Sequence, residues 1–177
     1  MLKKELDYET RAKHVINLVA YNPNGNPPGS SAKRDLTILV DDINEAPVFE
    51  RFIGSKPPPM ENEPSEVGNK AGRVVFNDDS DKLSYELIDE AGFFSIDQSG
   101  NVIVQQQIDR EWACSRGLAG AGQGHPVVVR VTDSCTAAQR QSDPACAPKT
   151  TEAQVFVSFL SIFQFLIFFI DPSWKCR

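Results

Sequence analysis

The stretch that most constrains this chain covers residues 41–49 and reads DDINEAPVF. Asp42, Asn44 and Glu45 place three side chains with hard oxygen donors within four positions, and Pro47 follows them. Because proline fixes its own backbone and disfavours helix at the residue before it, the segment is expected to be an extended connector. Calcium takes six to eight oxygen ligands from carboxylates, amides and backbone carbonyls. Taken alone, the stretch predicts either calcium ligands or a polar turn after a strand.

The size and charge of the chain narrow the function classes. Its 177 residues suffice for one domain and part of another. A hydrophobic content of 41% is enough for a core and argues against global disorder. The net charge of −6 excludes the broad basic surface of a nucleic-acid-binding protein. No signal peptide is visible. Motifs described below recur along the chain as a repeat, and Met1 falls in the middle of one such repeat, so we expect a fragment or a wrongly assigned start.

Two strands are predicted before the connector. Residues 14–20 alternate, with Ile16, Leu18 and Ala20 on one side, which predicts a half-buried strand. Residues 22–31 are rich in Asn, Pro, Gly and Ser and predict a loop, and residues 36–40 predict the second strand. Because two strands alone cannot bury a core, this part needs missing neighbours or leans on the later part of the chain.

The rest of the chain also favours β-structure. Short alternating runs at 73–76, 83–87 and 127–131 predict strands, and residues 94–104 predict a hairpin with Gly100 in the turn. No stretch keeps a helical period over three turns. We therefore predict an all-β chain, in which residues 49–159 form a Greek-key, immunoglobulin-like β-sandwich. Residues 1–48 would be the end of a preceding repeat with its linker, and residues 160–177 a hydrophobic tail of unclear role.

Several motifs recur in a fixed order between Leu6 and Asp133. They are the Leu-Asp-x-Glu box at 6–9 with its counterpart at 108–111, the linker D-x-N-E-A-P-x-F at 42–49, Glu61-Asn62, an acidic turn at 77–81, F-x-I-D-x-x-G at 94–100, and a strand ending at Asp133. Their order and spacing are far more specific than any one of them alone. In this combination the chain resembles the extracellular repeats of the cadherin family.

The resemblance implies a Ca²⁺ site at the joint between two successive repeats. Its ligands would come from the box of the upper repeat, from the linker with two backbone carbonyls, and from the lower repeat. The expected ligands are Asp7, Glu9, Asp42, Ile43 (carbonyl), Asn44, Glu45, Ala46 (carbonyl), Asn77, Asp79 and Asp133. Asn77 stands where the family usually has Asp, and the register Asp79-x-Asp81 is the alternative. With this change and a shorter linker, fewer or weaker calcium sites are expected than in an intact joint.

Electrostatic repulsion between the expected carboxylate ligands also favours a bound cation. Brought together without a metal they would repel one another, and divalent cations relieve that repulsion. A second, incomplete joint is expected at the far end of the repeat, formed by Glu61, Asp109 and Glu111. No linker motif follows the last strand, so three solvated carboxylates without metal are the expectation there.

The resemblance further implies calcium-dependent, homophilic cell–cell adhesion on the extracellular side of the plasma membrane. The partners would be like or related cadherin-type proteins on neighbouring cells, and the full-length protein would be attached to the membrane. The alternative is a calcium-free sandwich that only spaces other domains of a cell-surface protein.

The cysteines and the C-terminal tail leave alternatives open. Cys135 and Cys146 bracket a polar stretch, and a disulfide between them suits an oxidising compartment, although Cys114 could pair with either and free thiols are the default. No C-x-x-C spacing favours zinc. The apolar run 155–170 is short for a spanning helix. Its first part, 153–159, is predicted to be the last strand of the repeat, and a membrane anchor is the minor alternative.

Enzymatic activity is not predicted. His14 lies in a strand pattern and is interpreted as a surface or edge residue, whereas His125 follows a glycine-rich loop without a nucleophile at a recognisable spacing. The chain has no G-x-S-x-G, phosphate-binding loop or H-E-x-x-H motif. The carboxylates fit a calcium joint better than a glycosidase pair.

Overall fold

The computed structural model describes residues 4–24, 30–79, 82–109 and 124–160. The chain divides into two compact units. The first comprises residues 1–44 and 135–146, and the second residues 45–134 and 147–177. The hydrophobic tail at 160–177, for which a membrane anchor was the minor alternative, lies beyond Leu160 outside the described residues. Among the described residues, no helix has the length and apolar character needed to cross a bilayer.

The first unit contains a two-stranded antiparallel ribbon. Strand β1 (Lys13–Asn22) pairs with β2 (Ser30–Leu39), preceded by the short helix α1 (Tyr8–Arg11). The prediction that residues 14–20 are half-buried is wrong, because all of them except His14 are exposed. Both strands form as predicted, and among the described residues no further strand extends this two-stranded sheet, which by itself cannot bury a core.

Short helices interrupt the predicted all-β pattern. Helix α3 (Ala137–Ser142) belongs to the first unit, and a 3-10 turn (Pro64–Glu66) to the second. Neither these helices nor α1 is long enough to display a helical period, which explains why periodicity did not reveal them. Side chains at the helix starts could have indicated them, since Asp7 and Thr136 are N-caps.

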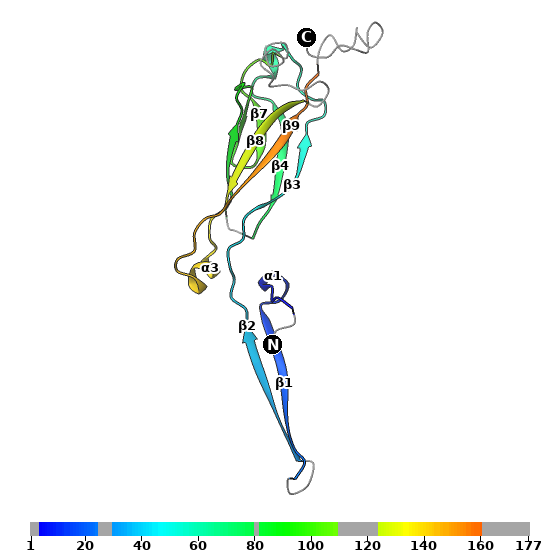
Figure 1. The fold of residues 1–177 in the computed structure, drawn as a ribbon. Helices are drawn as coiled ribbons and strands as arrows, with labels where there is room; N and C mark the ends of the chain where they lie inside the picture. Colours follow the sequence, from blue (N-terminus) through cyan, green and yellow to red (C-terminus); the bar gives the residue numbers. More distant parts are fainter. Residues whose placement is uncertain (1–3, 25–29, 80–81, 110–123, 161–177) are drawn as a thin grey trace. The chain divides into compact units, whose positions relative to one another are not determined.

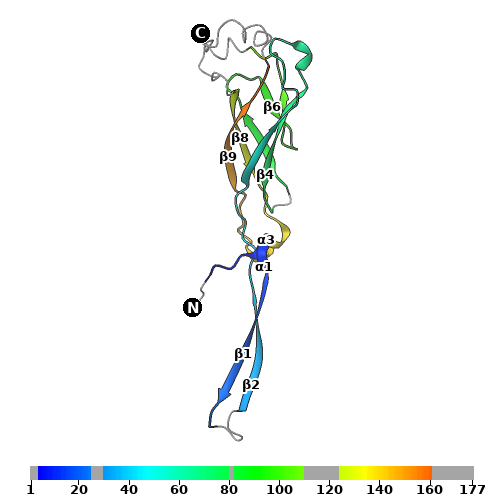
Figure 2. The ribbon, with the colours of Figure 1, turned by 90° about the vertical axis from the view of Figure 1, so that its right-hand side faces the viewer.

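The second unit is a β-sandwich of two antiparallel sheets. One sheet has the order β3 (Val48–Gly54), β4 (Lys70–Asn77), β7 (Asn101–Val104), β6 (Phe94–Ile96). The other has the order β5 (Ser84–Ile88), β8 (His125–Thr132), β9 (Thr150–Val157). Figure 1 labels β3, β4, β7, β8 and β9, and Figure 2 adds the label of β6. The seven strands of the described residues divide four and three, as in the constant-type immunoglobulin fold, which confirms the predicted class.

Alternating side chains of both sheets form the core. In β8, Val127, Val129 and Val131 are each at most 1% exposed, while the residues between them are half-buried. Val102 and Val104 of β7 belong to the same core from the opposite sheet, with 0% exposure. The strand prediction for 127–131 is therefore confirmed, including the alternation that generates the buried face.

The predicted hairpin at 94–104 is also confirmed. Gly100 has a φ of +76°, and an added Cβ would lie 2.9 Å from the carbonyl oxygen of Val74. Glycine thus meets both the backbone conformation and the close approach of the neighbouring strand. Asp97 completes the turn, because its Oδ1 accepts hydrogen bonds from the backbone N–H groups of Ser99 and Asn101. The last predicted strand, 153–159, corresponds to β9.

Candidate metal-binding linker

The linker residues of the first unit are buried despite their polarity. Asp42 is 5% exposed and Asn44 4%, whereas the side chain of Ile43 between them is 67% exposed. Asp42 Oδ1 accepts a hydrogen bond from Gln139 Nε2 at 3.0 Å. The extended segment thus directs its alternate oxygen-bearing side chains inward and leaves the apolar one outside, which suits the expected ligand roles of Asp42 and Asn44.

Asp7, from the upper box, has a local structural role. It is the N-cap of α1, and its Oδ1 accepts from the N–H groups of Glu9 at 3.1 Å and Thr10 at 3.3 Å. Its Oδ2 accepts from the Thr10 hydroxyl at 2.6 Å. The hydrogen bonds from Thr10 and Glu9 hold the pKa of Asp7 below its ordinary value. The cap fixes the turn that carries the exposed side chain of Glu9.

Two expected ligands of the second unit lie together. Carboxylate oxygens of Glu45, in the linker, and Asp79, just after β4, are within 4.8 Å of each other, and both residues are exposed. Two like charges at this distance repel, and a divalent cation relieves that repulsion. Asn77 is the exposed last residue of β4, two positions before Asp79. These oxygen donors fit calcium, and the alternative with Asp81 lies outside the described residues.

Asp133 lies where β8 ends. It is 4% exposed, and its Oδ1 accepts from the Lys149 N–H at 2.6 Å, while its own N–H donates to the Lys149 carbonyl at 3.0 Å. These two bonds join the segments that follow β8 and precede β9. The strand-end aspartate predicted from the sequence is therefore held in place by its backbone surroundings.

The expected ligands are divided between the two units. The first unit holds Asp7, Glu9, Asp42, Ile43 and Asn44, and the second holds Glu45, Ala46, Asn77, Asp79 and Asp133. Within the second unit, the structure brings the carboxylates of Glu45 and Asp79 together. The complete ligand set of one joint stays a prediction.

The far end of the sandwich differs from the expectation of three solvated carboxylates. Glu61 is 1% exposed, so it is not solvated. Its N–H donates to the Leu160 carbonyl at 2.8 Å, and the N–H of Asn62 donates to the Ile108 carbonyl at 2.9 Å. These backbone bonds bring the Glu61 segment beside the chain that carries the exposed Asp109. Glu111 lies outside the described residues.

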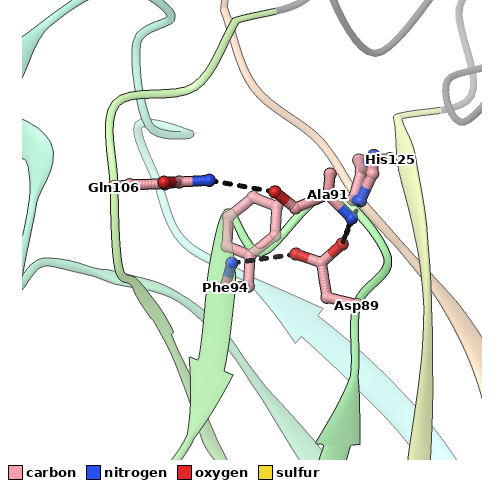
Figure 3. Close-up of polar contacts among 5 residues, drawn as sticks. All are labelled: Asp89, Ala91, Phe94, Gln106 and His125. Atoms are coloured by element: carbon pink, nitrogen blue, oxygen red, sulfur yellow. Dashed lines mark hydrogen bonds and ion pairs between the residues drawn. The ribbon is translucent and has the colours of Figure 1, made fainter. Parts of the chain in front are cut away.

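A buried Asp–His pair escaped the sequence analysis. His125 Nε2 lies 2.6 Å from Asp89 Oδ1, and both side chains are at most 2% exposed. Asp89 also accepts from the N–H groups of Ala91 at 3.0 Å and Phe94 at 2.9 Å (Figure 3). The rings of Phe93 and Phe94 lie 5.4 and 5.9 Å from the imidazole. His125 is thus a core residue that joins the start of β8 to the turn before β6.

Burial of Asp89 opposes its ionisation, but other groups outweigh that effect. The hydrogen bond and the charge of His125, together with the two backbone N–H donors, hold the pKa of Asp89 below its ordinary value. An ionised carboxylate only accepts hydrogen bonds, so Nε2 of the histidine is the donor. The pair stabilises the fold of the sandwich.

The disulfide prediction is confirmed. Cys135 and Cys146 are joined, with a Cα–Cα distance of 6.3 Å. The other two cysteines, Cys114 and Cys176, lie outside the described residues. Because Cys135 and Cys146 bind each other, the alternative in which Cys114 pairs with Cys135 or Cys146 is wrong.

Known proteins with similar sequences are cadherins and protocadherins. Human cadherin-17 is 32% identical over 118 residues, covering 63% of this chain and 14% of that protein. Mouse protocadherin Fat 2 is 34% identical over 111 residues, covering 60% of this chain and 2% of that protein. Human protocadherin-1 is 35% identical over 143 residues, covering 72% of this chain and 13% of that protein. The chain thus spans only a small part of each of these relatives. No family model matches it.

Solved structures with a similar fold are also cadherin extracellular domains. Domains 1–4 of protocadherin gamma B7 superpose with a TM-score of 0.57 at 23% identity, covering 89% of this chain and 34% of that one. Domains 22–24 of mouse cadherin-23 give a TM-score of 0.54 at 23% identity, covering 89% of this chain and 45% of that one. The motifs at the linker, the seven-strand sandwich and these relatives agree with one another. The chain carries a repeat of the cadherin family.

Proposed function

We propose that this chain is part of a calcium-dependent cell–cell adhesion protein. Ca²⁺ would bind at the joint between tandem repeats, on the extracellular side of the plasma membrane. The partners would be like or related cadherin-type proteins on neighbouring cells, with no enzymatic role and with membrane attachment in the full-length protein. A bound divalent cation supplies positive charge that the clustered carboxylates lack, and ligands shared between segments restrict their relative motion.

The observation that carries the proposal is the proximity of the carboxylates of Glu45 and Asp79, which lie within 4.8 Å of each other. Glu45 continues the linker sequence in which Asp42 and Asn44 are polar and buried. The carboxylate pair is exposed, so a cation can reach it from solvent. Extracellular calcium modules work at dissociation constants on the order of 10⁻⁴–10⁻³ M, which do not require a closed cage. The family relationship supports the same role for these oxygens.

Calorimetric titration of the full chain with calcium tests this proposal. We expect saturable binding in the millimolar range or tighter, and we expect Glu45→Gln to weaken it roughly tenfold, because charge count sets calcium affinity. Glu90→Gln is the matched control, since Glu90 is exposed and lies outside the predicted ligand set. Calcium binding that is absent, or equal in the Glu45→Gln and Glu90→Gln variants, would contradict the proposal and favour the calcium-free spacer.

Limited proteolysis tests whether calcium binding also makes the linker more rigid. Without calcium, repulsion between carboxylates is expected to loosen the linker, so a protease should cut near residues 44–46 faster in chelator than in millimolar calcium. The Glu45→Gln variant should lose part of this protection, and Glu90→Gln should keep it. Equal cleavage rates with and without calcium would mean that the linker is only a tether.

A further inference from the structure

The loop between β8 and β9 has an internal architecture that a simple connection would not need. The Cys135–Cys146 disulfide closes it, and α3 lies inside. A capping box fixes the start of that helix, because Thr136 Oγ1 accepts from the Gln139 N–H at 3.1 Å and Gln139 Oε1 accepts from the Thr136 N–H at 2.8 Å. The capping box holds the amide of Gln139 in one orientation.

The other end of that amide binds the linker. With Oε1 committed to the cap, Gln139 Nε2 donates to Asp42 Oδ1 at 3.0 Å, across 97 positions of sequence. Gln139 is 0% exposed and Asp42 5%, so the bond is shielded from water. Loss of a buried donor to a carboxylate leaves a poorly solvated charge, which makes such bonds worth more than neutral ones.

We propose that the disulfide-closed loop 135–146 is a latch that holds Asp42, at the start of the linker, without any metal, and that Gln139 is its positioning residue. Residues 133–134 join this loop to β8, and residues 147–149 join it to β9. Within the first unit, the linker is therefore tied to this loop by the bond between Asp42 and Gln139.

The latch also bears on calcium, and this part rests on the proposed function. Groups behind a ligand that donate to one carboxylate oxygen orient the other oxygen toward the metal, and their loss commonly weakens binding by about 10–100-fold. The amide of Gln139 occupies this position behind Asp42. It acts on Asp42 and is not itself an expected ligand.

The Gln139→Glu variant removes the hydrogen bond to Asp42 and keeps the helix cap. Glutamate serves in capping boxes as glutamine does, so the bond to the Thr136 N–H is kept, while the donor to Asp42 is replaced by a repelling carboxylate. Hydrogen exchange of the 40–46 segment in the full chain, measured in chelator, should become roughly tenfold faster, as expected for the loss of a buried bond to a charged group. Gln141→Glu is the matched control, because Gln141 lies in the same helix and is exposed.

A double variant that exchanges the two side chains distinguishes loss of this hydrogen bond from a general folding defect. In the double variant Gln139→Glu with Asp42→Asn, the amide and the carboxylate exchange places and the bond can form in reverse. We expect this double variant to recover most of the protection that Gln139→Glu loses, a coupling that an unrelated structural defect would not produce.

The outcomes separate the latch from the calcium proposal. Unchanged exchange in Gln139→Glu, or equal acceleration in Gln141→Glu, would overturn the latch even if calcium still binds. A double variant that exchanges as fast as Gln139→Glu would overturn it too. Absent calcium binding in the native chain would overturn the adhesion mechanism and leave the latch measurement in chelator unaffected.

Discussion

The ribbon of the first unit and the sandwich of the second are built from similar strands and differ in burial. Strands β1 and β2 pair along their whole length, from Lys13 with Leu39 to Asn22 with Ser30. Even so, Val19 of the ribbon is 56% exposed, whereas Val129 of the sandwich is 0% exposed. Alternating valines and leucines therefore make a strand in both places. A core forms only where a second sheet covers the first, because burial of apolar area supplies the main stabilisation.

The core should respond most strongly to truncation. Phe94, at 4% exposure in β6, packs inside the sandwich, and Phe94→Ala should lower the free energy of unfolding by about 3–5 kcal/mol. Tyr21, at 66% exposure in β1, is the aromatic counterpart in the ribbon, and Tyr21→Ala should leave the unfolding of the sandwich nearly unchanged. Urea unfolding followed by circular dichroism compares the two. Similar losses would mean that the ribbon also contributes to a core.

The buried pair of the sandwich should make its stability depend on acid. Because the folded-state pKa of Asp89 is lowered, the ionised carboxylate stabilises the fold above the pKa of the unfolded chain, and this contribution is lost as the pH falls through the folded-state value. Asp89→Asn should therefore cost about 1.5–3 kcal/mol at neutral pH and much less in acid. Unfolding curves between neutral and acidic pH give this difference.

The titratable group that faces Asp89 in this pair is His125. Glu90→Gln, at the neighbouring exposed position, is the control for a change of carboxylate to amide. If Asp89→Asn and the native chain lost stability in parallel as the pH falls, the Asp89–His125 pair would not be the source of acid sensitivity.

The smallest effect is expected in the ribbon itself. Val19→Thr keeps the β-branched shape of an exposed strand residue and should change the free energy of unfolding by no more than about 0.5 kcal/mol. Val129→Thr, at the buried position, should cost distinctly more because it places a hydroxyl in the core. Hydrogen exchange should likewise be faster in β1 than in β8, since exposed pairs open locally. Slow exchange in both would mean that the ribbon is covered by another surface in solution.

Much of the fold was predictable from short-range patterns. The strand at 127–131, the turn at Gly100 and the extended connector at Pro47 follow from alternation, glycine and proline, each of which acts over a few residues. The same holds for the candidate ligands, because oxygen donors at fixed spacing can be read directly from the linker. The helices α1 and α3 were missed because a helix of four or six residues has no measurable period, although the T-x-x-Q pattern of residues 136–139 is a capping box.

By itself, the sequence determined most of the strands, which turn the chain makes at residues 97–100, and that the chain resembles a cadherin repeat, although it missed β3 (Val48–Gly54). Only the tertiary structure decided which strands bury their apolar face, that Glu61 is buried, and that His125 pairs with Asp89 and Gln139 with Asp42. Strand formation depends on local backbone preferences and side-chain alternation. Burial and the pairing of polar groups depend on residues far apart in the chain, 36 positions for Asp89 with His125 and 97 for Asp42 with Gln139, and no local pattern encodes those distances.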